Sequence, residues 1–412
     1  MEITKTDKKI YIWIIASCFV MYTMSISIKM VYSAELVSII SYFNTTKSVA
    51  SLGLTVYYFI YAAAQLLLSI KKKKFDMHKF LIYTTAASAI SFAAVIFATN
   101  IWQVWIILAL NGILQSSVWG GIVQCLTKFL PEEWFNRTSI ILSLAFALGT
   151  AISYGTSAIG VAFFDWKFAF VLFAVLLLIS LVVFCVVIYF AKRHFGDVDH
   201  AAASTKGVDE SALRQPMDRR KVIVMLGFIL FVEFFLCSLY YGTTNWVPSL
   251  FKEVHNVDES YSLLITILVP VSMSPGPILA NNCAEKSGKI YHVCAVFLAV
   301  CSVCMLTMIF LYGANLILAI VLSLTSLFFN RGIVNLLSGY MPFKLNRVVP
   351  AGKTSLMINA VACIGAAVMP FVTGLIMDHF GWTAYYICMF AVAAVMTLIF
   401  IFASRNENKL LP

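Results

Sequence analysis

Long apolar segments separated by short polar ones dominate the sequence. A membrane-spanning helix needs about 20 mostly apolar residues to cross roughly 30 Å of hydrocarbon. Segments of this kind fall at residues 11–40, 50–70, 79–98, 102–129, 139–162 and 168–191, and again at 221–249, 259–282, 291–312, 315–341, 354–377 and 382–403. The pattern predicts an all-α integral membrane protein with twelve transmembrane helices in two groups of six.

One long polar stretch, residues 192–220, separates the two groups. It carries Gly, Ser and Asp residues without apolar periodicity, which is typical of a linker. We therefore expect an N-terminal six-helix half over 1–191, a cytoplasmic linker over 192–220 and a C-terminal six-helix half over 221–412. Such a plan favours a transporter whose site lies between the halves near the membrane midplane.

Composition and charge support this class. The chain is 61% hydrophobic and only 12% charged, which is roughly half the charge of a soluble domain. With both termini in the cytoplasm, 24 of the 29 Lys and Arg residues fall in inside segments, among them the run Lys71–Lys74. This excess predicts a multi-pass protein of the cell membrane with cytoplasmic termini. It also assigns the net charge of +10 to the anionic lipid surface rather than to a nucleic-acid partner.

Lys29, Glu233 and Arg331 are charged residues that lie well inside predicted spans, away from the span ends. A charge at the centre of such a helix costs roughly 2.5–3.5 kcal/mol on insertion scales, so it marks a functional candidate. Glu35 lies about 240° around the helix from Lys29, so the two do not pair within one helix. Glu233 has three possible roles: pairing with Arg331, pairing with Lys29 or coupling transport to protons. Arg331 has the alternative of extending its long side chain to the cytoplasmic surface.

Polar side chains recur at helical spacing on several spans. The stripe on the first span spreads over about 100° of arc and consists of Tyr22, Ser25, Lys29, Tyr32 and Ser33. On the fourth span, Asn111 and Gln115 lie one turn apart. Each such residue alone is compatible with an interhelical hydrogen bond. Stripes on several helices together favour a water-filled central cavity.

The sequence shows no motif of closely spaced catalytic or metal-ligating residues. The ten cysteines lie almost all within predicted spans, and the CSVC at 301–304 lacks a second pair of ligands. No catalytic constellation occurs at a predicted helix end. We expect no enzyme activity, no catalytic residue, no cofactor and no metal, and we expect a monomer.

Four segments of the sequence form recognisable motifs: NGILQSSVWGGIVQCLTKFLPEEWFNRTS around the fourth span, YYGTTNWVPSLFKEV at 240–254, SPGPIL in the eighth span and GLIMDHFGW at 374–382. These motifs resemble the Major Facilitator Superfamily, and within it the organophosphate:phosphate antiporter branch of glycerol-3-phosphate and hexose-phosphate transporters. The resemblance runs over the whole chain and implies the twelve-helix transporter fold.

The resemblance also implies positions for a phosphate clamp. The branch is expected to use an arginine on the first helix, an arginine on the seventh and a histidine on the fifth. These positions fall on Lys29, on Tyr240 and near Leu148. One cation therefore remains, and lysine lacks the planar fork that suits phosphate.

We accordingly expect a secondary transporter of a small organic anion that works by alternating access between the halves. A sugar acid, an organic acid and a phosphate ester are all possible substrates, with coupling by exchange or by proton symport through Glu233. The alternatives are a transporter of a neutral solute, with Lys29 held in a structural ion pair, and a membrane sensor of the same fold. Kinks at prolines of the eighth helix would help gating. The candidate substrate-binding residues are Lys29, Tyr22, Tyr32, Asn111, Gln115, Tyr240 and Arg331.

Overall fold

The computed structural model describes residues 4–70, 77–196, 219–340 and 351–405, and every regular element in these ranges is helical. We call α1–α8 the N-terminal half. Its elements are α1 (Lys5–Ala34), α2 (Leu36–Tyr42), α3 (Lys47–Ile70), α4 (Met77–Ala93), η1 (Ala94–Phe97), α5 (Ile101–Gln115), α6 (Val118–Phe129), α7 (Glu132–Phe163) and α8 (Lys167–Phe195).

We call α10–α18 the C-terminal half. Its elements are α10 (Arg219–Thr244), α11 (Val247–His255), α12 (Glu259–Thr266), α13 (Leu268–Met273), α14 (Gly276–Ser287), α15 (Ile290–Leu311), α16 (Leu316–Asn335), η2 (Leu336–Tyr340) and α18 (Ala351–Arg405). Most of the predicted linker, and the basic run Lys71–Lys74, lie outside the described residues.

Eleven of the described helical stretches are long and apolar enough to cross a membrane. The last of them, Met357–Arg405, has 49 residues, more than twice what one crossing needs. Gly381 interrupts this stretch with φ 75° and ψ −173°, a backbone conformation that is essentially restricted to glycine. The stretch therefore makes two crossings, and the prediction of twelve transmembrane helices is confirmed.

The eighth span, Glu259–Ser287, is interrupted as its prolines predict. It divides into α12, α13 and α14, with Pro270 inside α13 and Pro275 and Pro277 at the start of α14. Proline has no amide hydrogen to donate and clashes with the preceding turn, so the helix breaks there. The expected kinks are confirmed.

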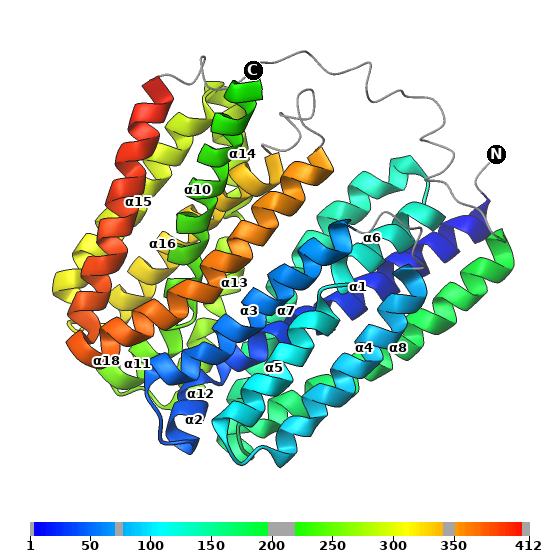
Figure 1. The fold of residues 1–412 in the computed structure, drawn as a ribbon, viewed down its shortest axis with the longest axis horizontal. Coiled ribbons are helices and arrows are strands. Elements are labelled where there is room, and N and C mark those ends of the chain that lie inside the picture. The colour runs from blue at the N-terminus through cyan, green and yellow to red at the C-terminus, as the bar shows by residue number, and fades with distance from the viewer. Residues whose placement is uncertain (1–3, 71–76, 197–218, 341–350, 406–412) are drawn as a thin grey trace.

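The two halves lie side by side, meet at one end and diverge towards the other (Figure 1). The start of α1 and the end of α18 lie where the halves diverge, and we call this the terminal end (Figure 1). We call the other end, where α2, α11 and α12 lie, the contact end. There Ser33 Oγ donates to Asn245 Oδ1 at 2.5 Å.

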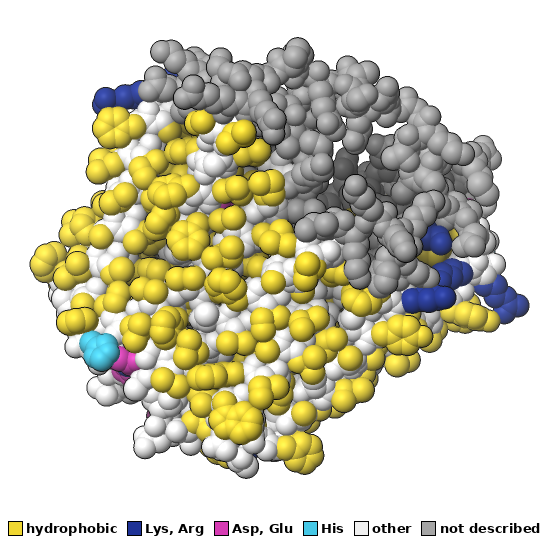
Figure 2. Space-filling model, viewed as in Figure 1, with side chains coloured by type: hydrophobic (Ala, Val, Ile, Leu, Met, Phe, Trp, Pro, Cys, Tyr) yellow, Lys and Arg dark blue, Asp and Glu magenta, His cyan; other side chains and the backbone are white. Residues whose placement is uncertain are grey.

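Hydrophobic side chains cover the outside of the molecule as well as its core. They spread over both halves in the space-filling view (Figure 2), and they include Phe97 and Phe310, each more than three-quarters exposed. A soluble protein rarely exposes a continuous apolar surface of this extent. The surface matches the lipid contact expected of membrane-spanning helices.

Glycines let helices within each half approach closely. A Cβ on Gly112 of α5 would lie 2.8 Å from the carbonyl oxygen of Tyr57 on α3. A Cβ on Gly365 of α18 would lie 2.7 Å from the carbonyl oxygen of Phe234 on α10. Small residues at such crossings are typical of helix packing in membranes. They bring α3 and α10, which carry much of the candidate site, against their neighbours.

Candidate functional site

A cavity of about 330 Å³, which we call the central cavity, lies between the two halves. Helices α1, α3, α5, α6 and α7 line it from the N-terminal half, and α10, α16, η2 and α18 line it from the C-terminal half. Small-molecule sites occupy about 300–1,000 Å³. The central cavity is therefore large enough for a small solute, and it lies where the sequence pattern predicted a site.

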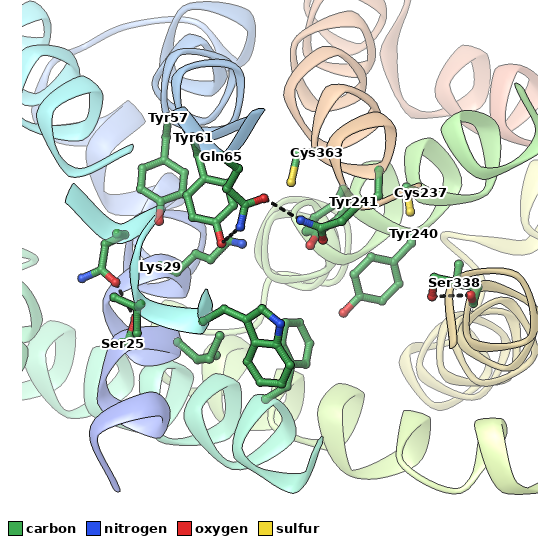
Figure 3. A pocket seen from close by; sticks show the side chains of 18 of the residues that line it. Ser25, Lys29, Tyr57, Tyr61, Gln65, Cys237, Tyr240, Tyr241, Ser338 and Cys363 are labelled. Carbon is green, nitrogen blue, oxygen red and sulfur yellow. Dashed lines mark hydrogen bonds between the residues drawn. The ribbon is translucent and has the colours of Figure 1, made fainter. Parts of the chain in front are cut away.

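Lys29 reaches the central cavity from α1 and rests on aromatic rings of α3 (Figure 3). Its Nζ lies 4.4 Å from the ring centroid of Tyr61 and 5.1 Å from that of Tyr58. Cation–π contacts hold an ammonium group without neutralising it. Among the described residues, the ion pairs join other groups, and Lys29 has no acidic partner.

Arg331 of α16 lines the same cavity from the opposite half. Its Cζ lies 5.1 Å from the ring centroid of Phe146 on α7 and 5.7 Å from that of Tyr240 on α10. The guanidinium group therefore contacts aromatic rings of both halves. The alternative in which Arg331 extends to the membrane surface does not match this position.

Glu233 of α10 is fully buried beside the central cavity. Its Oε1 accepts a long contact of 3.5 Å from Cys237 Sγ, and its Oε2 has no hydrogen-bond partner in the part of the chain that the structure describes. Neither Lys29 nor Arg331 forms an ion pair with it among the described residues. Burial without a partner disfavours the ionised form of a carboxyl group.

Amide side chains link the two halves across the cavity. Asn359 Nδ2 on α18 donates to Gln65 Oε1 on α3 at 2.6 Å, and Gln65 Nε2 donates to the Tyr61 hydroxyl oxygen at 3.0 Å (Figure 3). Tyr61 in turn lies under Lys29. A hydrogen-bonded chain thus runs from the C-terminal half to the ring that supports the cation.

Gln115 lines the central cavity as expected, whereas Asn111 does not. Ser25 Oγ donates to Gln115 Oε1, and Gln115 Nε2 donates to Ser88 Oγ at 2.7 Å. Ser88 Oγ donates to Asn111 Oδ1 at 2.6 Å. Asn111 is fully buried and also donates to Ser91 Oγ at 2.8 Å. Asn111 therefore lies one helical turn behind Gln115, among the serines of α4, and does not face the central cavity in this conformation.

Tyr32 also lies away from the cavity lining, against the expectation from the stripe on the first span. It is 1% exposed, and its hydroxyl donates to the carbonyl oxygen of Ala50 at 2.6 Å. Its ring packs over Gly53 of α3. The polar stripe on the first span covers a wider arc than the cavity does, so Tyr32 at its edge contacts the neighbouring helix α3 instead. Tyr22 does line the cavity, with its ring centroid 5.1 Å from that of Trp119.

Several lining residues were not singled out from the sequence. The sequence feature that could have identified them is a pair of adjacent tyrosines within an apolar segment, which occurs on both α3 and α10. The lining residues that were missed include Tyr57, Tyr61, Tyr241, Ser338, Asn359 and Cys363.

Among the described residues, no group of three or more His, Cys, Asp and Glu side chains is arranged to hold a metal ion. The ten cysteines are all free thiols. The chemistry that the cavity offers is therefore that of two cations, one buried carboxyl group, tyrosines and amides.

The sequence matches the family model of the Major Facilitator Superfamily over residues 14–349. The chain belongs to the Major Facilitator Superfamily. It is thus a multi-pass membrane transporter and not an enzyme, with a small-molecule substrate. No curated protein sequence matches this superfamily member.

Solved structures with the same fold support this assignment. A bacterial homologue of the human lysosomal transporter Spinster, inward-facing and unoccupied, is similar with a TM-score of 0.77 and 12% identity over 98% of each chain. A point mutant of the peptide transporter POT is similar with a TM-score of 0.73 and 12% identity over 97% of this chain and 95% of that one. A point mutant of the nucleoside transporter NupG has a TM-score of 0.72 and 11% identity over 95% of this chain and 99% of its own. At such identities the likeness establishes the fold and leaves the substrate open.

Proposed function

We propose that this superfamily member is a secondary transporter of a small organic anion, with Lys29 and Arg331 as its anion-binding cations. The observation that carries the proposal is that these two cations, one from each half, line one cavity and have no acidic partner among the described residues. An uncompensated charge in a membrane-embedded site is costly. An anionic substrate would supply the missing counter-charge.

The surrounding side chains suit a hydroxylated or carboxylated molecule. Tyr22 and Tyr240 offer rings and hydroxyl groups, and Gln115 offers an amide beside Ser25. Sugar acids, organic acids and phosphate esters all remain within this class. The resemblance to the organophosphate branch supports a cation at Lys29, while Tyr240 supplies no second cation at its position. Arg331 provides a second cation from a different helix.

Alternating access is supported by the arrangement of the halves. They touch at the contact end and diverge at the terminal end (Figure 1). The bacterial Spinster homologue, which has the same fold, is in an inward-facing conformation. The distribution of basic residues favours placing the terminal end on the cytoplasmic side. The described conformation is then one in which the cavity faces the cytoplasm.

Glu233 is our candidate for proton coupling. It is buried without an ion-pair partner in this conformation, which favours its neutral form. A change of conformation that brings water or Arg331 to the carboxyl group would release the proton. The neutral-solute alternative rests on an ion pair between Lys29 and Glu233, and the described residues do not form one.

The test combines binding with uptake. Thermal-shift screening of the purified protein against gluconate, glucuronate, succinate, glucose 6-phosphate and inorganic phosphate selects a probe, and proteoliposomes then measure its radiolabelled uptake. Lys29→Ala is expected to abolish uptake, Lys29→Arg to retain part of it, and Arg331→Gln to weaken it strongly. Lys9→Ala is the control, because Lys9 lies on the same helix and is exposed outside the cavity.

Normal uptake by Lys29→Ala would overturn the proposal. Binding by the wild-type protein without any uptake would instead favour the membrane sensor. The two outcomes are separated because the thermal shift reports ligand binding and the proteoliposomes report flux.

A further inference from the structure

A second buried acid, Glu35, lies away from the central cavity at the seam between the halves. It follows the first membrane span, which ends at Ala34, and joins α1 to α2. Its side chain is fully buried, and neither carboxyl oxygen is within hydrogen-bonding distance and geometry of a partner among the described residues. The proposed substrate site does not use this residue.

The seam around Glu35 is built from both halves. Ala34, Tyr154 and Ala158 of the N-terminal half form one apolar cluster with Leu263 of α12 in the C-terminal half. Ser157 lies on α7 in the same region, and its hydroxyl acts on the Glu35 carboxyl group. Glu35 therefore lies next to the contact between α7 and α12, and separation of these two helices would expose its carboxyl group to water.

The charged groups near Glu35 are acidic. Glu259 of α12 and Asp165, before α8, both act on it electrostatically and disfavour its ionisation. Glu259 is itself held by Ser38 and by Lys252, whose Nζ lies 2.5 Å from Glu259 Oε2. Burial raises the pKa of the Glu35 carboxyl group well above its ordinary value. The Ser157 and Ser38 hydroxyls oppose this rise, and the two acids add to it.

We propose that Glu35 is a proton-binding site that closes the contact end when it is protonated and favours opening when it is ionised. With the halves in contact, Glu35 is fully buried and has no cationic partner among the described residues, so this state favours the neutral acid. With the halves apart, Glu35 becomes an ordinary hydrated carboxyl group that is ionised at neutral pH. The proposal rests on the alternating access of the proposed function and adds a gate that responds to pH on the side away from the termini.

The direction of the pH dependence follows from proton linkage. The closed contact end binds a proton more tightly than the open one, so low pH favours closure. As pH rises above the ordinary glutamate value, the ratio of open to closed molecules increases by up to about tenfold per pH unit. The increase ends when pH passes the raised pKa of Glu35 in the closed state.

Distance measurements on the full-length protein in lipid nanodiscs test the proposal. Spin labels are attached through a ketone-bearing amino acid at Phe163 and Phe310, which are 78% and 77% exposed in the two halves. The wild-type protein is expected to show a longer separation at about pH 8 that is reduced at about pH 5. Glu35→Gln mimics the protonated acid and is expected to keep the short separation at both values. Glu35→Asp is expected to retain a pH response.

Two results would overturn the proposal. One is a wild-type distance distribution that is the same at both pH values, and the other is a pH response in Glu35→Gln equal to that of the wild type. A response that persists in Glu233→Gln and disappears in Glu35→Gln supports the proposal. Because uptake by Lys29→Ala tests the anion site separately, failure of one proposal is distinguishable from failure of the other.

Discussion

Asp378 of the C-terminal half accepts a hydrogen bond from the backbone amide of Ser48 in the N-terminal half, at 2.9 Å. Its second carboxyl oxygen accepts from the amide of Lys47 at 3.1 Å. Because α3 begins at Lys47, these amides have no partner within the helix. A carboxylate of one half thus caps a helix of the other, where the helix dipole favours negative charge.

Removal of this cap is expected to shift the protein towards an open contact end. Because Asp378 is exposed, Asp378→Ala should destabilise the closed contact end by about 0.5–1 kcal/mol, which is the lower part of the range for loss of a helix cap. That corresponds to a roughly two- to fivefold rise in the open population, measured with spin labels at Phe163 and Phe310. Asp258→Ala is the control, because Asp258 is exposed and its side chain makes no capping hydrogen bond. An equal effect of both substitutions would exclude the cap as the cause.

Gly374 is expected to control the same contact sterically. A Cβ at this position would lie 3.0 Å from the Cα and the amide nitrogen of Ser48. Gly374→Ala should therefore lengthen the separation of the labels, with the helices still intact by circular dichroism. Gly227→Ala on α10 is the matched control, since no atom lies within 4 Å of its added methyl group. A short separation in Gly374→Ala would show that α3 accommodates the methyl group by shifting.

The ring of Tyr61 is expected to support anion binding through Lys29. Tyr61→Leu removes the cation–π contact of 4.4 Å and should raise KM for the anionic substrate about three- to tenfold. Tyr61→Phe keeps the ring and removes only the acceptor for Gln65, so a smaller rise is expected. The measurement is initial uptake into proteoliposomes over a range of substrate concentrations. Equal KM values for the two variants would assign the effect to the hydroxyl group and not to the ring.

Glu233→Gln is expected to uncouple transport from protons. Glutamine has a similar size and no titratable proton, so substrate should still equilibrate across the membrane without accumulating under a pH gradient. Uptake is measured with and without a gradient, and exchange of internal for external substrate provides the positive control. Accumulation in Glu233→Gln that still follows the pH gradient would remove Glu233 as the coupling group.

Helical periodicity located some site residues and misplaced others. Lys29, Glu233 and Arg331 were identified because a charge inside a membrane span is energetically costly and therefore marks a functional candidate. All three line the central cavity. Tyr32 and Asn111 were expected on the cavity face, and both contact neighbouring helices instead. A face about 100° wide borders neighbouring helices as well as a cavity, and only packing decides which of the two a side chain meets.

The GLIMDHFGW motif also shows that the sequence does not reveal contacts between distant segments. Its likeness to a transporter family was readable, but the roles of Gly374 and Asp378 were not. Their partners, Lys47 and Ser48, lie more than 300 residues away in the sequence. A contact over such a separation leaves no local pattern of polar and apolar residues.

The sequence alone determined the membrane class, the number of spans and the presence of intramembrane charges. Each of these follows from the cost of placing polar groups in hydrocarbon, which every segment meets independently. The tertiary structure decided which charges share one cavity, which tyrosines support Lys29 and which acid lies in the seam between the halves. These relations depend on the rotation of each helix about its axis and on distant segments packing together, so they are fixed only when the helices assemble.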